Sequence, residues 1–214
     1  MKKLFTLLAA AIVVLTSCGP KIYKTNDFES KTASHKTVAI LPADVFIQLR
    51  PNEMKKLSET QLAELQRKTG QNIQDRMYSW FLKRSDKFKY TVSFQDISKT
   101  NALLQQAGIS HNNISARTKE ELAGLLGVDA IISTRSSMTK PMSEGAAVAV
   151  GILFGSWGST NDVQTSITIN EGTKGDLVWK FDHTASGSVG SDPDRLVNAL
   201  MRKASKKFPY NAKQ

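Results

Sequence analysis

The segment that decides the fold is Leu125-Leu126-Gly127-Val128-Asp129-Ala130-Ile131-Ile132-Ser133. Its first part ends a predicted helix, because Thr118-Lys119-Glu120-Glu121 has the form of a capping box and Gly127 is the residue type that commonly ends helices. Its second part, from Val128 to Ser133, is a short apolar run of the kind found in strands buried on both faces. A helix that leads directly into a buried strand predicts an α/β domain.

The upstream sequence repeats this alternation. Thr37 to Leu41, ended by Pro42, predicts another buried strand, and Tyr90 to Phe94 predicts a third strand that precedes a short helix over Ser98 to Gln106. Between them, the capping box Ser58-Glu59-Thr60-Gln61 opens a long amphipathic helix that ends near Lys83-Arg84. Because helices separate the strands, at least part of the sheet is expected to be parallel. The apolar or semi-apolar face of the long helix comprises Leu62, Leu65, Thr69, Ile73, Met77, Trp80 and Phe81.

The downstream sequence adds a hairpin and a closing helix. Residues 163–169 alternate between apolar and polar, Glu171 to Gly175 predicts a turn, and Leu177 to Phe181 predicts the second strand. Asp192-Pro193 is a helix-start signal, and no linker within residues 37–208 indicates a second domain. The predicted fold is one α/β domain of two or three layers, with a mixed sheet flanked by helices. The buried face of the closing helix comprises Leu196, Val197, Leu200, Met201 and Ala204.

The N-terminal residues have the features of an export signal. Lys2 and Lys3 precede the apolar run Leu4 to Val14, which is too short to span a membrane. Leu15-Thr16-Ser17-Cys18 resembles the lipobox of bacterial lipoproteins, which implies cleavage after residue 17 and lipidation of Cys18, the only cysteine in the chain. The alternative is an ordinary cleaved signal with a stray cysteine, but no A-x-A site precedes Cys18. Two or three acyl chains would anchor the protein stably, at about 0.8 kcal/mol per buried methylene.

The resemblance to lipoproteins also has implications for location. Gly19 follows Cys18, where an aspartate would imply retention at the inner membrane, so an outer-membrane, periplasm-facing lipoprotein is expected. Residues 18–36 are polar and lack a clear period, which predicts a flexible tether, with the α/β domain over residues 37–214.

The mature chain is expected to be basic. The whole chain has a net charge of +10, and removal of Lys2 and Lys3 leaves about +8. No nucleic-acid-binding motif accompanies this charge, and the export signal removes the protein from the cytoplasm. We therefore expect no nucleic-acid partner. Lipid head groups, lipopolysaccharide phosphates and cell-wall carboxylates are the anionic neighbours of an envelope protein, and a merely solvated basic surface is the alternative.

The core pattern is similar to that of a known group of envelope proteins. Val38-Ala39-Ile40-Leu41-Pro42, Val92-Ser93-Phe94-Gln95-Asp96 with Leu103-Leu104, and Leu125 to Ile132 resemble the group that contains the TolB amino-terminal domain, the curli secretion channel CsgG and the penicillin-binding-protein activator LpoB. The likeness spans residues 37 to 181. It implies a non-catalytic envelope role in assembly, secretion or activation of a protein partner.

The segment 143–162 interrupts the α/β pattern with a glycine-rich apolar run. About 9–11 residues suffice for a tilted transmembrane β-strand, so one hypothesis is a strand of an oligomeric pore, and another is an apolar loop that contacts a membrane or a second copy. A buried hairpin or helix within the domain is the third interpretation. The residues that would make a membrane or oligomer contact are Ala146, Val148, Val150, Gly151, Ile152, Leu153, Phe154, Gly155 and Trp157.

Catalytic signatures are absent from the sequence. His35, His111 and His183 lie far apart without metal-ligand spacing, and no nucleophile elbow or phosphate-binding loop occurs, so we expect no enzyme, no metal and no cofactor. The preferred hypothesis is an anchored binding or assembly component of the envelope. A cell-wall hydrolase that uses Asp182, His183 and Asp129 is the alternative from another class.

Overall fold

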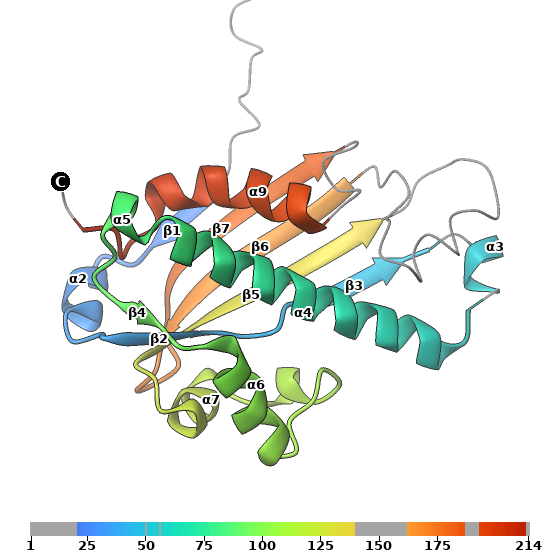
Figure 1. The fold of residues 1–214 in the computed structure, drawn as a ribbon, viewed down its shortest axis with the longest axis horizontal. Helices are drawn as coiled ribbons and strands as arrows, with labels where there is room; N and C mark the ends of the chain where they lie inside the picture. The colour runs from blue at the N-terminus through green and yellow to red at the C-terminus, as the bar shows by residue number, and fades with distance from the viewer. Residues whose placement is uncertain (1–20, 50, 56, 140–161, 187–192, 213–214) are drawn as a thin grey trace, which may run out of the picture.

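The computed structural model of the chain describes residues 21–49, 51–55, 57–139, 162–186 and 193–212, which form a mixed β-sheet with helices on both faces (Figure 1). β2, β3 and β4 pair in parallel with their neighbours, and β1, β5, β6 and β7 pair with one another in antiparallel fashion. The predicted α/β class with a mixed sheet is confirmed. The strands lie in the order β1 (Lys21–Lys24), β7 (Leu177–Ser186), β6 (Asp162–Glu171), β5 (Ala130–Thr139), β2 (Thr37–Ile40) and β4 (Ser93–Phe94), and β3 (Asp44–Gln48) pairs with β5 beyond the end of β2.

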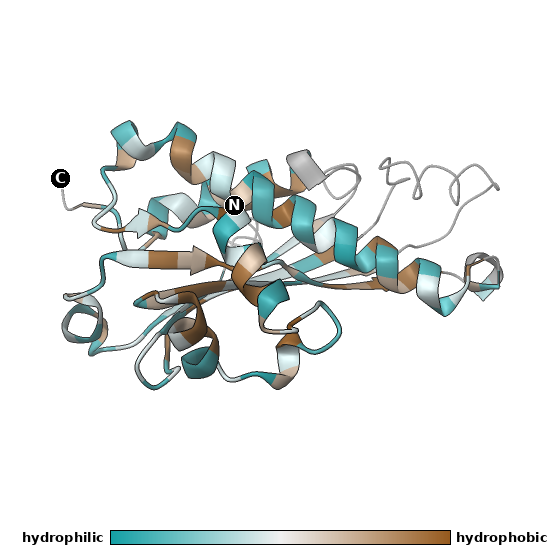
Figure 2. Ribbon diagram, turned by 60° about the horizontal axis from the view of Figure 1, so that its bottom comes forward, coloured by the Kyte–Doolittle hydropathy of each residue, from teal (hydrophilic) through white to brown (hydrophobic). Residues whose placement is uncertain are grey.

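The helices make unequal layers on the two faces. α4 (Glu59–Lys83) and α9 (Pro193–Ala204) lie side by side along one face, whereas α6 (Ile97–Gln106) and α7 (Lys119–Leu126) lie on the other side, near β2 (Figures 1 and 2). The domain therefore has three layers near β2 and two layers elsewhere. Short helices complete the described chain: α2 (Phe28–Thr32), α3 (Pro51–Met54), α5 (Ser85–Phe88) and the 3-10 turns η2 (Ile114–Ala116) and η4 (Ser205–Lys207).

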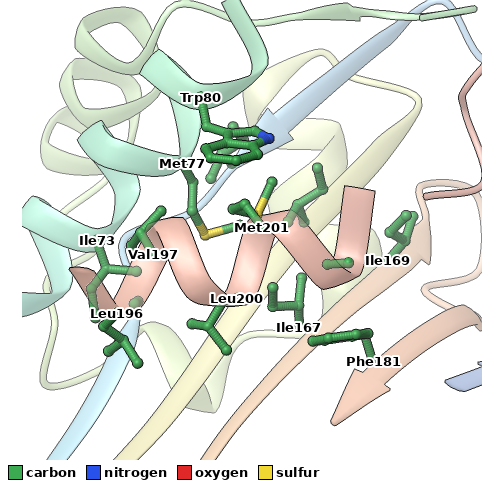
Figure 3. Packing of buried hydrophobic residues seen from close by; sticks show 14 of the residues in the cluster. Ile73, Met77, Trp80, Ile167, Ile169, Phe181, Leu196, Val197, Leu200 and Met201 are labelled. Atoms are coloured by element: carbon green, nitrogen blue, oxygen red, sulfur yellow. The ribbon is translucent and has the colours of Figure 1, made fainter. Parts of the chain in front are cut away.

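The main core lies between the sheet and the pair α4 and α9. Figure 3 shows Met77 of α4 and Met201 of α9 packed between the two helices, with Phe181 of β7 below them. Both capping boxes expected from the sequence are present, at Ser58 and Thr118. The expected apolar faces of both helices are buried, apart from Leu62, which is half-buried. A smaller core under α6 and α7 contains Ala39, Leu41, Leu104, Leu122, Ala123, Leu126 and Ile131.

A one-residue bulge joins β2 to β3. Ile40 of β2 pairs with Ile132 of β5, and Asp44 of β3 pairs with Arg135 of β5. Four residue steps from β2 to β3 therefore match three steps along β5. The extra residue reverses the alternation of side chains, and Val45 therefore faces the same core as Ile40.

Helix α4 approaches this bulge very closely at a glycine. The Ala43 N–H donates a hydrogen bond of 3.0 Å to the Gly70 carbonyl oxygen. A Cβ on Gly70 would overlap the Ala43 carbonyl oxygen and lie 3.2 Å from its carbon. Only glycine lets the backbone of α4 contact the sheet here.

The tether predicted over residues 18–36 is wrong for its described part. Lys21–Lys24 forms the edge strand β1, which pairs with β7, and Phe28 of α2 is buried in the main core. His35, which the prediction placed in the tether, is buried, and its Nδ1 lies 2.7 Å from the Tyr210 hydroxyl oxygen. The domain therefore includes residues 21–36, which precede the expected start at Thr37. The hydropathy pattern did not predict β1 because all four of its side chains are exposed. The strand therefore lacks the alternation of buried and exposed residues that is typical of strands.

Other strand boundaries also differ from expectation. The strand expected over Tyr90 to Phe94 is reduced to Ser93–Phe94, and Tyr90 makes only an isolated bridge with Asn211. β5 continues past Ser133 to Thr139, because its polar residues alternate with buried ones on a half-open sheet. The hairpin of β6 and β7 is confirmed, although β7 extends to Ser186 and includes His183.

Candidate functional site

The residues predicted to contact lipid or a second copy lie outside the described residues. This applies to Cys18 and to the set from Ala146 to Trp157. The structure does define where segment 140–161 attaches, since Thr139 at the end of β5 pairs directly with Asp162 at the start of β6. The segment therefore connects two adjacent strand ends, and its role stays a prediction.

The three residues of the hydrolase alternative do not come together. Asp182 and His183 are adjacent on β7, so they point to opposite faces of the sheet. Asp182 Oδ2 lies 2.9 Å from Lys180 Nζ on the open face. Asp129 immediately precedes β5 and is six residues from Arg135, which lies in the same cross-strand row as Asp182. At 3.4 Å per residue, Asp129 is therefore about 20 Å from that row.

Asp129 instead has a structural role at the junction between α7 and β5. Its Oδ2 accepts hydrogen bonds of 2.8 Å from the backbone N–H groups of Lys36 and Thr37, which fixes the start of β2. Burial raises the pKa of Asp129, but these two N–H groups and the nearby charges of His35 and Lys36 outweigh it, so the pKa lies below its usual value.

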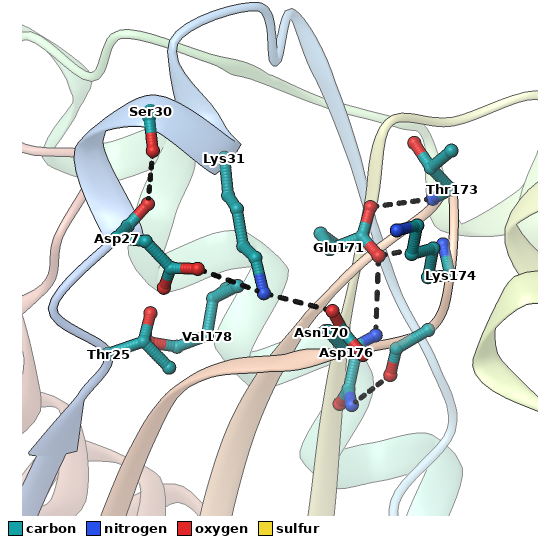
Figure 4. A network of polar contacts seen from close by, with 11 residues as sticks. Thr25, Asp27, Ser30, Lys31, Asn170, Glu171, Thr173, Lys174, Asp176 and Val178 are labelled. Atoms are coloured by element: carbon teal, nitrogen blue, oxygen red, sulfur yellow. Dashed lines mark hydrogen bonds and ion pairs between the residues drawn. The ribbon is translucent and has the colours of Figure 1, made fainter.

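The turn between β6 and β7 is fixed to the same junction. Glu171 accepts backbone hydrogen bonds of 2.8 Å from Thr173 and 2.7 Å from Lys174 (Figure 4). The Gly172 N–H donates to the Asp129 carbonyl oxygen at 2.7 Å, and a Cβ on Gly172 would lie 2.8 Å from that oxygen. These polar groups are therefore used by the fold.

The face of the sheet beyond α6 and α7 is polar. The residues of β5, β6 and β7 that point to this side alternate with the buried ones and are exposed or half-buried. Antiparallel strands commonly leave one face to solvent, so polarity is expected, and five of the nine outward side chains carry hydroxyl groups. The outward residues are Ser133, Arg135, Ser137, Gln164, Ser166, Thr168, Lys180, Asp182 and Thr184.

A groove forms where η2 and the start of α7 stand over this polar face. It has a volume of about 500 Å³. Its wall and floor contain four cationic side chains and one carboxylate, together with several hydroxyl groups, and we call it the basic groove. It is lined by Leu41, Pro42, Asp44, Ile114, Ser115, Arg117, Lys119, Ser133, Thr134, Arg135, Ser166, Thr168 and Lys180.

Two of the four cations of the basic groove have carboxylate partners. Arg135 Nε lies 2.9 Å from Asp44 Oδ2, and Lys180 is paired with Asp182. Arg117 and Lys119 make no ion pair with any residue that the structure describes. The groove thus has an excess of positive charge.

Lys119 is the least favourably placed of these cations. Burial lowers the pKa of Lys119, and the charge of Arg135 lowers it further, while Asp44 offsets only part of the effect. Lys119 is also the first residue of α7, where the helix dipole favours an acidic side chain. The fold therefore holds a half-buried positive charge at a position that favours a negative one.

A hydroxyl group completes the polar floor of the groove. Ser133 Oγ is buried and has no hydrogen-bond partner among the described residues. A buried hydroxyl without a partner is rare, and it can donate to an oxygen that enters the groove. Together, the unpaired cations and the free hydroxyl give the groove the chemistry of a site for carboxylate or phosphate oxygens.

The described residues contain no group of three or more histidine, cysteine or acidic residues arranged to hold a metal ion. Within the same residues, no helix has the length and hydropathy needed to cross a membrane.

Sequence patterns did not reveal the basic groove. Its cations come from the loop before α7, the start of α7, β5 and β7, far apart in the chain. The one local signal is Lys119 between Thr118 and Glu120, a cation in the first turn of a capped helix, where acidic residues are normally favoured.

Comparison with known proteins finds matches only among solved structures, at low sequence identity. No family model matches the chain, and no curated protein sequence matches it. Among solved structures, lipoprotein GNA1162 from Neisseria meningitidis is 14% identical with a TM-score of 0.43, over 81% of this chain and 97% of that one. The PelC dodecamer from Paraburkholderia phytofirmans is 11% identical with a TM-score of 0.40, over 91% and 99%. The LpoB C-terminal domain from Salmonella enterica is 10% identical with a TM-score of 0.35, over 74% and 92%.

Similarity at these values does not determine function, since one fold serves many roles. The function therefore has to be inferred from the site itself.

Proposed function

We propose that the protein is a non-catalytic envelope lipoprotein, anchored through Cys18 in the outer membrane and facing the periplasm, which binds an acidic segment of an envelope protein in its basic groove. The lipobox supports the anchor. The position of Lys119 supports the binding role, and it is the single observation on which that role rests.

Lys119 matters because the fold gains nothing from its charge. A cation in the first turn opposes the helix dipole by about 0.3–1 kcal/mol, and burial adds to this penalty. Natural proteins break such local rules mainly where function requires it. A bound carboxylate would remove the conflict, since it would neutralise Lys119 and interact favourably with the N-terminus of α7.

The expected contribution of Lys119 to binding follows from ordinary magnitudes. A hydrogen bond to a charged group contributes about 1.5–3 kcal/mol when solvent is partly excluded, which corresponds to a roughly 10- to 150-fold change in affinity. Arg135 should contribute less, because its side chain is 74% exposed and already paired with Asp44.

Binding of a short glutamate-rich peptide to the lipidated protein in detergent tests the groove. The peptide in which glutamine replaces each glutamate is the ligand control. Lys119→Gln should weaken binding of the acidic peptide at least tenfold. Lys207→Gln removes the same charge from η4, outside the groove, and should have little effect. Equal losses in the two variants would mean that net charge alone attracts the peptide, and the groove would not be the site.

The anchor is tested separately. Cys18→Ser should shift the protein from the membrane fraction to the soluble fraction of cells, since no acyl chain could then be attached. Unchanged membrane fractionation would contradict the anchor.

A further inference from the structure

Edge strand β1 presents an apolar and basic surface. It pairs with β7 on one side, and its other edge has no strand partner among the described residues. Ile22 is 41% exposed and Tyr23 is 51% exposed, two of the few large apolar side chains with such exposure in the described chain. Exposed edges with apolar side chains are aggregation hazards unless something covers them.

Two cations lie at the end of β1 nearest Cys18. Lys21 is the first residue of the strand and pairs in register with Asp182. The next residue of β7, His183, has its Nε2 3.4 Å from Nζ of Lys203, which is exposed near the end of α9. Lys21 shares the open face of the sheet with Asp182, whereas His183 and Lys203 lie on the face covered by α9, so the two cations flank the apolar residues of β1 on the two faces of the sheet edge. Apolar residues flanked by cations favour an anionic membrane interface.

The distance from the anchor determines what can cover this surface. Three residue steps separate Cys18 from Lys21, so the chain between them spans at most about 10 Å. The head-group layer is itself about 5–8 Å thick on each side of the hydrocarbon core. An acyl chain on Cys18 therefore leaves Lys21 no room to move far from the lipid head groups.

We propose that β1 lies on the surface of the bilayer, with Ile22 and Tyr23 in the interfacial layer and Lys21 and Lys203 against anionic lipid head groups. This inference rests on the lipid anchor of the proposed function, but not on the basic groove. The domain is then held edge-on to the membrane rather than suspended on a long tether.

This orientation places the basic groove at a defined height. β5 is three strands from β1 in the sheet, which is about 14 Å at the usual strand spacing. An acidic segment that reaches Lys119 and Arg135 would thus approach within about 15–20 Å of the head groups. The partner is accordingly expected to be membrane-bound or membrane-proximal.

Fluorescence quenching on vesicles tests the orientation. Because Cys18 would be acylated, a cysteine introduced as Tyr23→Cys can be labelled selectively with an environment-sensitive dye. The control is Gln106→Cys on α6, an exposed residue on a helix remote from β1. The lipidated variants are incorporated into vesicles of phosphatidylethanolamine and phosphatidylglycerol that contain a head-group spin label.

The dye on residue 23 should be quenched several-fold more than the dye on residue 106. Lys21→Glu should reduce the difference in quenching between the two positions on vesicles that contain phosphatidylglycerol, because this anionic lipid repels the new carboxylate. On vesicles of phosphatidylcholine alone, the difference in quenching should stay the same. Equal quenching at both positions in protein that co-floats with the vesicles would overturn the orientation and leave the anchor intact. Protein that does not co-float at all would overturn the anchor and the orientation together.

Discussion

The contact between α4 and the bulge that joins β2 to β3 gives a sharp prediction about stability. Gly70→Ala would place a methyl group against the Ala43 carbonyl oxygen, because a Cβ there overlaps that atom. To relieve the overlap, α4 must move away from the sheet by about 1 Å, since Cβ contacts shorter than about 3.2–3.4 Å are rare in well-packed interiors.

The magnitude follows from three contributions. Overpacking costs roughly 1–3 kcal/mol, and loss of the bond from the buried Ala43 N–H to Gly70 costs roughly another 1–3 kcal/mol. The higher helix propensity of alanine stabilises the folded state by about 1 kcal/mol and so offsets part of this loss. Gly70→Ala should therefore lower the free energy of unfolding by about 3 kcal/mol, within a range of about 1–5 kcal/mol.

Urea denaturation followed by circular dichroism measures this change. With a slope of about 2 kcal/mol per M, the midpoint should fall by about 1.5 M. Gly124→Ala is the matched control, because Gly124 also lies within a helix but has open space around its Cβ position, and it should raise stability by up to about 1 kcal/mol. If both variants were equally stabilised, α4 would not contact the bulge as described.

Three further predictions address other parts of the molecule. Burial lowers the pKa of His35, partly offset by Asp129 and Glu171, so the unfolded chain binds more protons as the pH falls below about 6.5 and stability should decrease there. In His35→Gln the free energy of unfolding should depend less on pH between about 5 and 7 than in the parent, whereas an unchanged slope would show that His35 titrates normally. Lys119→Gln should raise the free energy of unfolding by about 0.3–1 kcal/mol while it weakens peptide binding, and a loss of stability would show that the charge serves the fold. Deletion of residues 145–158 should leave the domain folded, because Thr139 and Asp162 are directly paired, but should reduce the size of detergent-extracted oligomers or ease membrane extraction. If neither property changed, the proposed contact role of that segment would be wrong.

The elements with strong local signals were predictable from the sequence. The capping boxes at Ser58 and Thr118, the positive φ of Gly127 and the apolar faces of the long helices all have local physical causes, and the structure confirms them. The buried strand after Gly127 was predictable for the same reason, because its central residues are apolar on both faces.

Elements that depend on distant partners were not predictable. β1 is four exposed residues long, so only its pairing with β7 makes it a strand. β3 follows a bulge that reverses the alternation, which hides its relation to β2. The basic groove combines residues from β3, η2, α7, β5, β6 and β7, and neither spacing nor composition brings Arg117 and Lys180 together before the sheet is known.

The role of the basic groove can be tested most directly in cells. A photo-crosslinking amino acid at Ser115, an exposed residue of the groove wall, would capture whatever occupies the groove of the anchored protein. The account predicts one crosslinked membrane-associated partner, joined through a segment rich in Asp and Glu. The crosslink should be lost in Lys119→Glu and retained in Lys207→Glu. A crosslink that survives Lys119→Glu, or that maps to a segment without acidic residues, would contradict the proposed function.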